Sequence, residues 1–175
     1  VGTSNVVVGN NAGNSIESGG NYNVLVGDNA GTAITTGDNN VLVGYASGDA
    51  ITTGTDNTAF GHNSLSTLTT ANNNVAIGRK ALFSSTTASN NTAVGKDALL
   101  LNTTGAENVA VGANALDANT TGASNVAVGQ GALDTNTTGL QNTAVGHDSM
   151  KANTTGAQNV AVGKGALNAN TTASN

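Results

Sequence analysis

Apolar and polar residues alternate in a short phrase, Asn-Val/Thr-x-Val-Gly, that returns along the whole chain. In a strand the second and fourth residues of such a phrase lie on one face and the third on the other. Val and Thr are β-branched and favour pleated surfaces. Each phrase is therefore predicted to form a short β-strand.

The phrase returns at a fixed step, which makes the chain a repeat array. After one step of 18 residues, every later step is 17 residues. The later units follow the consensus N-V-A-V-G-x-x-A-L-x-x-N-T-T-G-x-x, and positions 1 to 17 below are counted from its first Asn. The units begin at Asn5, Asn23, Asn40, Asn57, Asn74, Asn91, Asn108, Asn125, Asn142 and Asn159.

A 17-residue unit is too short for a helical hairpin, so each unit is predicted to be one coil of an all-β, parallel β-solenoid. Gly at position 5 suits a tight corner or a positive φ angle, and Gly at position 15 offers a second corner. One strand, a turn, a second short strand and a turn complete the coil. Ten coils stacked about 4.8 Å apart span roughly 48 Å. Residues 1–175 are expected to form one repeat array, cut from a longer fibre.

Position 4 is apolar in every unit and is predicted to line the interior of the solenoid. This predicted core comprises Val8, Val26, Val43, Phe60, Ile77, Val94, Val111, Val128, Val145 and Val162. Position 3 is predicted to face outward, where a continuous apolar row indicates contact with another chain. This predicted chain interface comprises Val7, Leu25, Leu42, Ala59, Ala76, Ala93, Ala110, Ala127, Ala144 and Ala161. The alternative is that Ala is simply tolerated on a surface.

Position 1 is Asn in all ten units. Identical amides stacked at strand spacing can hydrogen-bond along a solenoid, so this row is predicted to be a structural Asn ladder. A row of ligand-binding amides is the alternative. The ladder comprises Asn5, Asn23, Asn40, Asn57, Asn74, Asn91, Asn108, Asn125, Asn142 and Asn159.

Positions 9 and 12 compensate one another in size. The first three units carry Gly at position 9 and Ile at position 12, as in Gly31 and Ile34. Later units carry Leu or Met at position 9 and Asn or Ser at position 12, as in Leu116 and Asn119. Because interiors are close-packed, both positions are predicted to fill one volume.

The phrase N-V-A-V-G followed by A-L, at Asn108 to Leu116, Asn125 to Leu133 and Asn159 to Leu167, resembles the YadA-like head repeats of trimeric autotransporter adhesins. It is also similar to N-T-A-V-G…N-T-T-G repeats of phage tail-fibre-like proteins. The resemblance implies a left-handed β-roll assembled as a homotrimer, with apolar residues at the trimer axis. The unit here is longer than the adhesin repeat.

The distribution of charge argues against nucleic-acid binding, and the length of the apolar runs argues against membrane insertion. The formal net charge is −5, and residues 1–78 contain five acidic residues but no Lys or Arg. No basic stripe suited to nucleic acid is present. No apolar run approaches the roughly 20 residues that membrane insertion requires.

Candidate catalytic groups are few. His62 and His147 lie five units apart, about 24 Å at strand spacing, which is too far for a shared site. Asp117 and Asp134 occupy position 10 of successive units and are the nearest approach to a carboxylate pair. Calcium-binding and phosphate-binding repeat signatures are absent. We expect no enzyme, no cofactor and no metal site.

The sequence therefore predicts an extracellular structural fibre, an adhesin shaft or head on a cell or virion surface. Its expected partner is itself, and a host surface or glycan is a further candidate partner. One alternative is ice binding through the Thr-Thr pairs at positions 13 and 14, although adjacent threonines point to opposite faces. Another is a self-assembling filament whose uncapped strand edges pair end to end.

Overall fold

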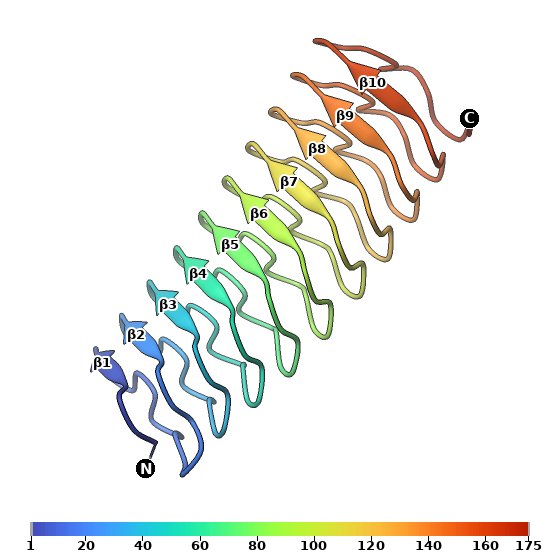
Figure 1. The fold of residues 1–175 in the computed structure, drawn as a ribbon. Helices are drawn as coiled ribbons and strands as arrows, with labels where there is room; N and C mark the ends of the chain where they lie inside the picture. Colours follow the sequence, from blue (N-terminus) through green and yellow to red (C-terminus); the bar gives the residue numbers. More distant parts are fainter. Residues whose placement is uncertain (1, 175) are drawn as a thin grey trace.

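The computed structural model describes residues 2–174, and within them every regular element is a three-residue β-strand. The strands form one parallel sheet in chain order, so the chain is a β-solenoid in which each repeat unit makes one coil (Figure 1). Coils are numbered with their strands. The strands are β1 (Val6–Val8), β2 (Val24–Val26), β3 (Val41–Val43), β4 (Thr58–Phe60), β5 (Val75–Ile77), β6 (Thr92–Val94), β7 (Val109–Val111), β8 (Val126–Val128), β9 (Thr143–Val145) and β10 (Val160–Val162).

The register follows the repeat, so that Val109 pairs with Val126 and Ala110 with Ala127. The predicted second strand is not assigned in any coil within residues 2–174, where the rest of each unit forms turns and bends. These turns still bond from coil to coil. At position 13, for example, the amide of Thr120 donates to the carbonyl of Thr137 at 2.9 Å. Inter-coil hydrogen bonds therefore extend well beyond the sheet.

The structure reverses the predicted orientation of the strand. Position 3 lies inside the coil, because Ala110 and Ala127 are fully buried, whereas the position 4 side chains of Phe60 and Ile77 are 52% and 42% exposed. The predicted core at position 4 was therefore wrong. These side chains are outward or half-buried: Val8, Val26, Val43, Phe60, Ile77, Val94, Val111, Val128, Val145 and Val162.

The predicted chain interface at position 3 was wrong for the same reason. From the second coil onward these residues are buried in the chain's own core: Leu25, Leu42, Ala59, Ala76, Ala93, Ala110, Ala127, Ala144 and Ala161. Val7, in the first coil, is 43% exposed. The narrow interior is already filled by the position 9 side chain, such as the fully buried Leu116. Only a small residue fits opposite it.

Packing of the interior explains the size compensation and extends it to position 3. Gly31 has a φ of 57°, and a Cβ built on it would lie 2.9 Å from both Leu25 Cδ2 and Ile34 Cδ1. Coils that carry Leu at position 3 and Ile at position 12 therefore leave no room at position 9. Coils with Ala at position 3 place a buried Leu there, such as Leu116. The prediction that positions 9 and 12 share one volume is confirmed.

The corner after the strand requires glycine for two reasons. Gly at position 5 adopts φ between 122° and 147° in all ten coils, a region that L side chains avoid. A Cβ on Gly112 would also lie 2.6 Å from the carbonyl oxygen of Gly129 in the next coil. Gly at position 15 has no such φ in coils 2, 3 and 6 to 9. At the second corner the left-handed residue is instead at position 17, as in Glu107 and Gln141.

The Asn ladder at position 1 is confirmed by its hydrogen bonds. The Asn125 amide N–H and Nδ2 both donate to Asn108 Oδ1, at 3.0 and 3.1 Å. Asn125 Nδ2 also donates to the carbonyl of Gly139 at 2.8 Å, which ties the strand to the second corner of its own coil. Each amide thus both closes one coil and joins it to the preceding one.

A second Asn ladder runs along position 12 in the later coils, and the sequence analysis did not predict it. Asn119 Nδ2 donates to Asn102 Oδ1 at 2.7 Å and to the carbonyl of Gly122 at 2.9 Å. Both Asn side chains are fully buried. Replacement of Ile by Asn at this position therefore exchanges apolar packing for a buried, bonded amide row.

Candidate interaction surface

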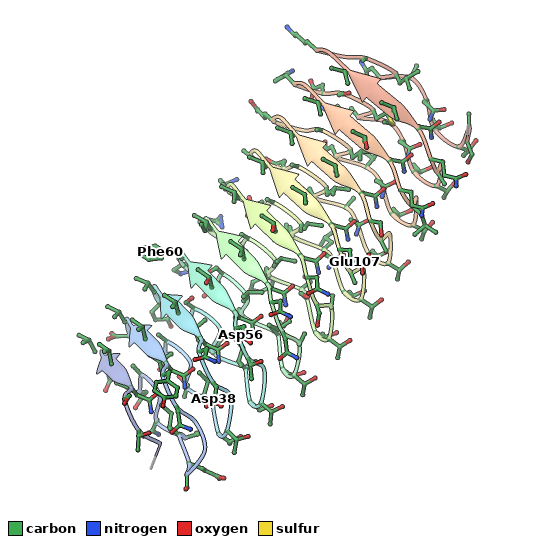
Figure 2. All side chains as sticks on the ribbon, viewed as in Figure 1. Asp38, Asp56, Phe60 and Glu107 are labelled. Carbon is green, nitrogen blue, oxygen red and sulfur yellow. The ribbon has the colours of Figure 1, made fainter. Side chains whose placement is uncertain are left out.

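An apolar strip covers the outer side of the sheet. It consists of the side chains at positions 2 and 4, and we call it the valine face. Neither position carries a charged residue in any coil. Figure 2 labels Phe60, which lies on this strip. Besides the position 4 residues given above, the valine face comprises Val6, Val24, Val41, Thr58, Val75, Thr92, Val109, Val126, Thr143 and Val160.

The valine face follows from strand alternation. Because the narrow interior accepts position 3, positions 2 and 4 must both point away from it. Stacking at strand spacing then aligns their side chains in two parallel columns. The sequence signal that could have revealed this is the small residue between two larger ones in Val-Ala-Val, since a narrow interior selects the small one.

Most Thr-Thr pairs divide as predicted, with position 14 exposed and position 13 half-buried, but both residues are exposed in Thr86-Thr87 and Thr171-Thr172. Thr121, at position 14, is exposed, whereas Thr120, at position 13, is half-buried. The Thr120 hydroxyl donates to the carbonyl of Thr137 at 3.0 Å. In coils 2 to 9 the position 13 hydroxyl is bonded to the next coil in this way, so these coils present a single free hydroxyl rank on this side, and an ordered ice face generally needs two.

Asp117 and Asp134 lie on neighbouring coils in partly buried sites. Burial raises the pKa of Asp117, and the nearby Asp97 charge adds to the effect, while a hydrogen bond from Asn114 and the charge of Lys96 oppose it. Burial also raises the pKa of Asp134, as do the charges of Asp117 and Asp148, against Lys151. The two carboxyl groups are therefore partly removed from water, and the charge of Asp117 disfavours ionisation of Asp134.

The two histidines lie in separate surroundings. His62 stacks on Tyr45 with ring centroids 5.3 Å apart and an angle of 16° between the rings. His147 Nδ1 lies 3.3 Å from Asp148 Oδ2. They do not form one site.

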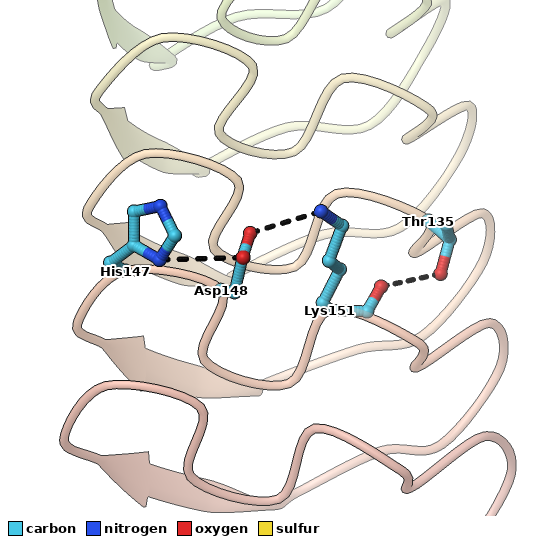
Figure 3. A network of polar contacts seen from close by, with 4 residues as sticks. All are labelled: Thr135, His147, Asp148 and Lys151. Carbon is cyan, nitrogen blue, oxygen red and sulfur yellow. Dashed lines mark hydrogen bonds and ion pairs between the residues drawn. The ribbon is translucent and has the colours of Figure 1, made fainter.

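A polar network surrounds His147 (Figure 3). Lys151 Nζ donates to Asp148 Oδ1 at 3.1 Å, on the carboxylate that also meets His147. The hydroxyl of Thr135 donates to the main-chain carbonyl of Lys151 at 2.6 Å. Because this hydroxyl is bonded to a carbonyl and not to the imidazole, the network contains no paired nucleophile and base.

The outer corner of the coils is polar. Asp56 and Glu107 are exposed at position 17, and Figure 2 shows them on the corner that precedes the strand. Asp38, one position earlier, accepts a hydrogen bond from the amide of Asn21 at 2.6 Å. These carboxylates join neighbouring coils or face solvent. Among residues 2–174 no three potential metal ligands cluster together.

In the described part of the chain there is no helix with the length and apolar character needed to cross a membrane. Comparison of the chain with protein families, with curated proteins and with solved structures finds no match.

Proposed function

We propose that this chain is the shaft or head of an extracellular structural fibre, and that copies of it assemble as a homotrimer through the valine face. The observation that carries the proposal is the strip itself, with ten coils of exposed or half-exposed Val, Ile, Phe and Thr and no charged residue. The resemblance to YadA-like heads supports the trimer and a position on a cell or virion surface. In this proposal the side chains of the valine face, and not those of position 3, pack together at the trimer axis.

Rod-like stiffness supports a mechanical role. Buried ladders at positions 1 and 12 and main-chain bonds at several positions join each coil to its neighbours. Bending the solenoid would strain several of these bonds at once. The strands follow one another in a nearly straight row (Figure 1). A spacer that holds a binding tip away from a surface needs this geometry.

The size and shape of the valine face favour a partner of the same kind. The strip is roughly 48 Å long and about 10 Å wide, on the order of 500 Å². This lies at the upper end of the roughly 300–600 Å² found for the largest apolar patch of a monomer. A second copy has the same length and the same coil spacing. It therefore matches the strip along its whole length, and the lack of charge suits a desolvated interface core.

The proposal is tested by sedimentation velocity on the wild-type chain and on Val111→Glu/Val128→Glu. We expect the wild type to sediment as an elongated trimer and the variant as an elongated monomer, because buried carboxylates would lack partners at the interface. Thr121→Glu/Thr138→Glu is the matched control, with the same charges on exposed residues outside the valine face, and it should remain trimeric. A wild-type monomer, or equal dissociation of both variants, would refute assembly through this face.

A further inference from the structure

We propose that coils 3 to 6 carry a binding site for an acidic polysaccharide, a polymer with carboxylate or sulfate groups. The site is formed by Tyr45, His62, Arg79, Lys80, Phe83 and Lys96, which we call the basic patch. It lies just past the glycine corner that ends each strand, so it is distinct from the valine face.

The basic patch contains the main concentration of positive charge on the molecule. Three of the five Lys and Arg residues fall in coils 5 and 6, and residues 1–78 have none. Lys96 Nζ lies 2.6 Å from Asp97 Oδ2, and Arg79 Nη1 lies 3.9 Å from Asp97 Oδ1. Asp97 thus pairs closely with Lys96, lies near Arg79 without a hydrogen bond to it, and neutralises one charge. About half of the Arg79 and Lys96 side chains remains exposed.

Four members of the patch form one row. Tyr45, His62, Arg79 and Lys96 occupy position 6 of successive coils, so the stacking places hydrogen-bond donors about 4.8 Å apart along the fibre axis. The stacked rings of Tyr45 and His62 continue the row beside the two cations. A linear polymer lying along the axis would meet a donor at every coil.

Fold requirements do not explain these residues. Position 6 lies outside the core and accepts many residue types, since outside the patch it is Asn10, Asp28, Ala113, Gln130, His147 or Lys164. Lys80, at position 7, has a left-handed φ of 57°, a conformation that Asn, Asp and Gly tolerate better. A lysine here is therefore not the residue that the backbone favours.

The aromatic members suit a sugar polymer. Lys80 Nζ lies 5.3 Å from the centroid of the Phe83 ring, and the half-buried Phe83 replaces the polar residues found at position 10 in coils 1 to 4. Aromatic rings offer apolar area beside a polar rim, and cations bind carboxylate or sulfate groups by charge-assisted hydrogen bonds. Asp117 borders the patch, so the polymer must tolerate a carboxylate close to the three cations. An acidic polysaccharide fits this combination best.

The test is binding of the full chain to immobilised heparin, with neutral dextran and double-stranded DNA as comparison ligands. Arg79→Gln/Lys80→Gln/Lys96→Gln should bind heparin at least about tenfold more weakly, since each lost cation removes a charge-assisted bond. Lys151→Gln/Lys164→Gln, which removes the two other lysines, should bind like the wild type. Tyr45→Ala should weaken binding by about threefold.

Three results would overturn the proposal: no heparin binding by the wild type, equal weakening in the triple variant and the lysine control, or equally tight binding of DNA. The last result would indicate a general polyanion surface. If Tyr45→Ala binds heparin as tightly as the wild type, only the cations contribute to binding, and this result would also contradict a glycan site. The triple variant should keep the sedimentation mass of the wild type, so failure here is separate from failure of the proposed assembly.

Discussion

At the residue scale, backbone conformation decides which side chains each position accepts. Coils 2 to 9 each place residues with positive φ at positions 5, 7, 9 and 17. Backbone conformation requires Gly only at position 5, where φ lies in a region that is essentially reserved for it. At position 9, Leu116 accepts a φ of 53° because its side chain fills the core. Core burial offsets local strain in these coils.

Gly112→Ala should lower the free energy of unfolding by about 1–3 kcal/mol beyond the effect of Gly163→Ala. Both glycines have the same kind of φ, but a Cβ on Gly112 meets the Gly129 carbonyl at 2.6 Å, whereas a Cβ on Gly163 meets nothing within 4 Å. The difference between the two variants, measured by urea unfolding, isolates the inter-coil clash. Equal losses would show that coils do not approach as closely as described.

The sequence was sufficient to predict the repeat, the parallel stack and the Asn ladder, because these follow from spacing and from one invariant residue type. It did not predict which strand face is inside. The larger side chains Val111 and Val128 were assigned to the core, but interior space is set by position 9, whose path cannot be read from alternation. The ladder at position 12 was missed because Asn119 was interpreted only by its size.

At the element scale, the two core types meet in coils 4 and 5. Leu68 occupies position 12 in coil 4, and the Asn ladder begins at Asn102 in coil 6. Between them the Ser85 hydroxyl is buried without a hydrogen-bond partner. In coils 6 to 9, where Asn at position 12 is fully buried, it also needs room at position 15, because a Cβ on Gly105 would lie 2.6 Å from Asn102 Oδ1. The less buried Asn170 of coil 10 is followed by Ala173 at position 15. Coil 5 has Ala88 there.

Ser85→Asn/Ala88→Gly should therefore raise the free energy of unfolding by about 1 kcal/mol, since Asn102 Nδ2 gains an acceptor and the buried hydroxyl is removed. Ser85→Asn alone should destabilise the chain through contact with the Ala88 methyl. Ala88→Gly alone should also be destabilising, by about 0.5–1 kcal/mol. Urea unfolding of the three variants measures the coupling. Additive effects would contradict the proposed extension of the ladder.

At the scale of the whole molecule, the narrow core and the long apolar face have separate roles. The core of Ala, Leu and Asn holds each coil to the next, and the valine face remains available for another chain. Charged residues occur only at positions 6, 7, 10, 13, 16 and 17, outside the valine face and outside the apolar core positions. A fibre built this way gains length by adding coils, while the area available for association grows in proportion.

The most direct test of the account is the thiol reactivity of three single-cysteine variants, because the chain itself contains no cysteine. Thr121→Cys should react rapidly in the folded chain, and Ala127→Cys should stay protected until the chain unfolds. Val128→Cys should be protected while copies are associated and become reactive when dilution separates them. Reaction of Ala127→Cys in the folded chain would contradict the buried face, and Val128→Cys reacting as fast as Thr121→Cys at every concentration would contradict association through the valine face.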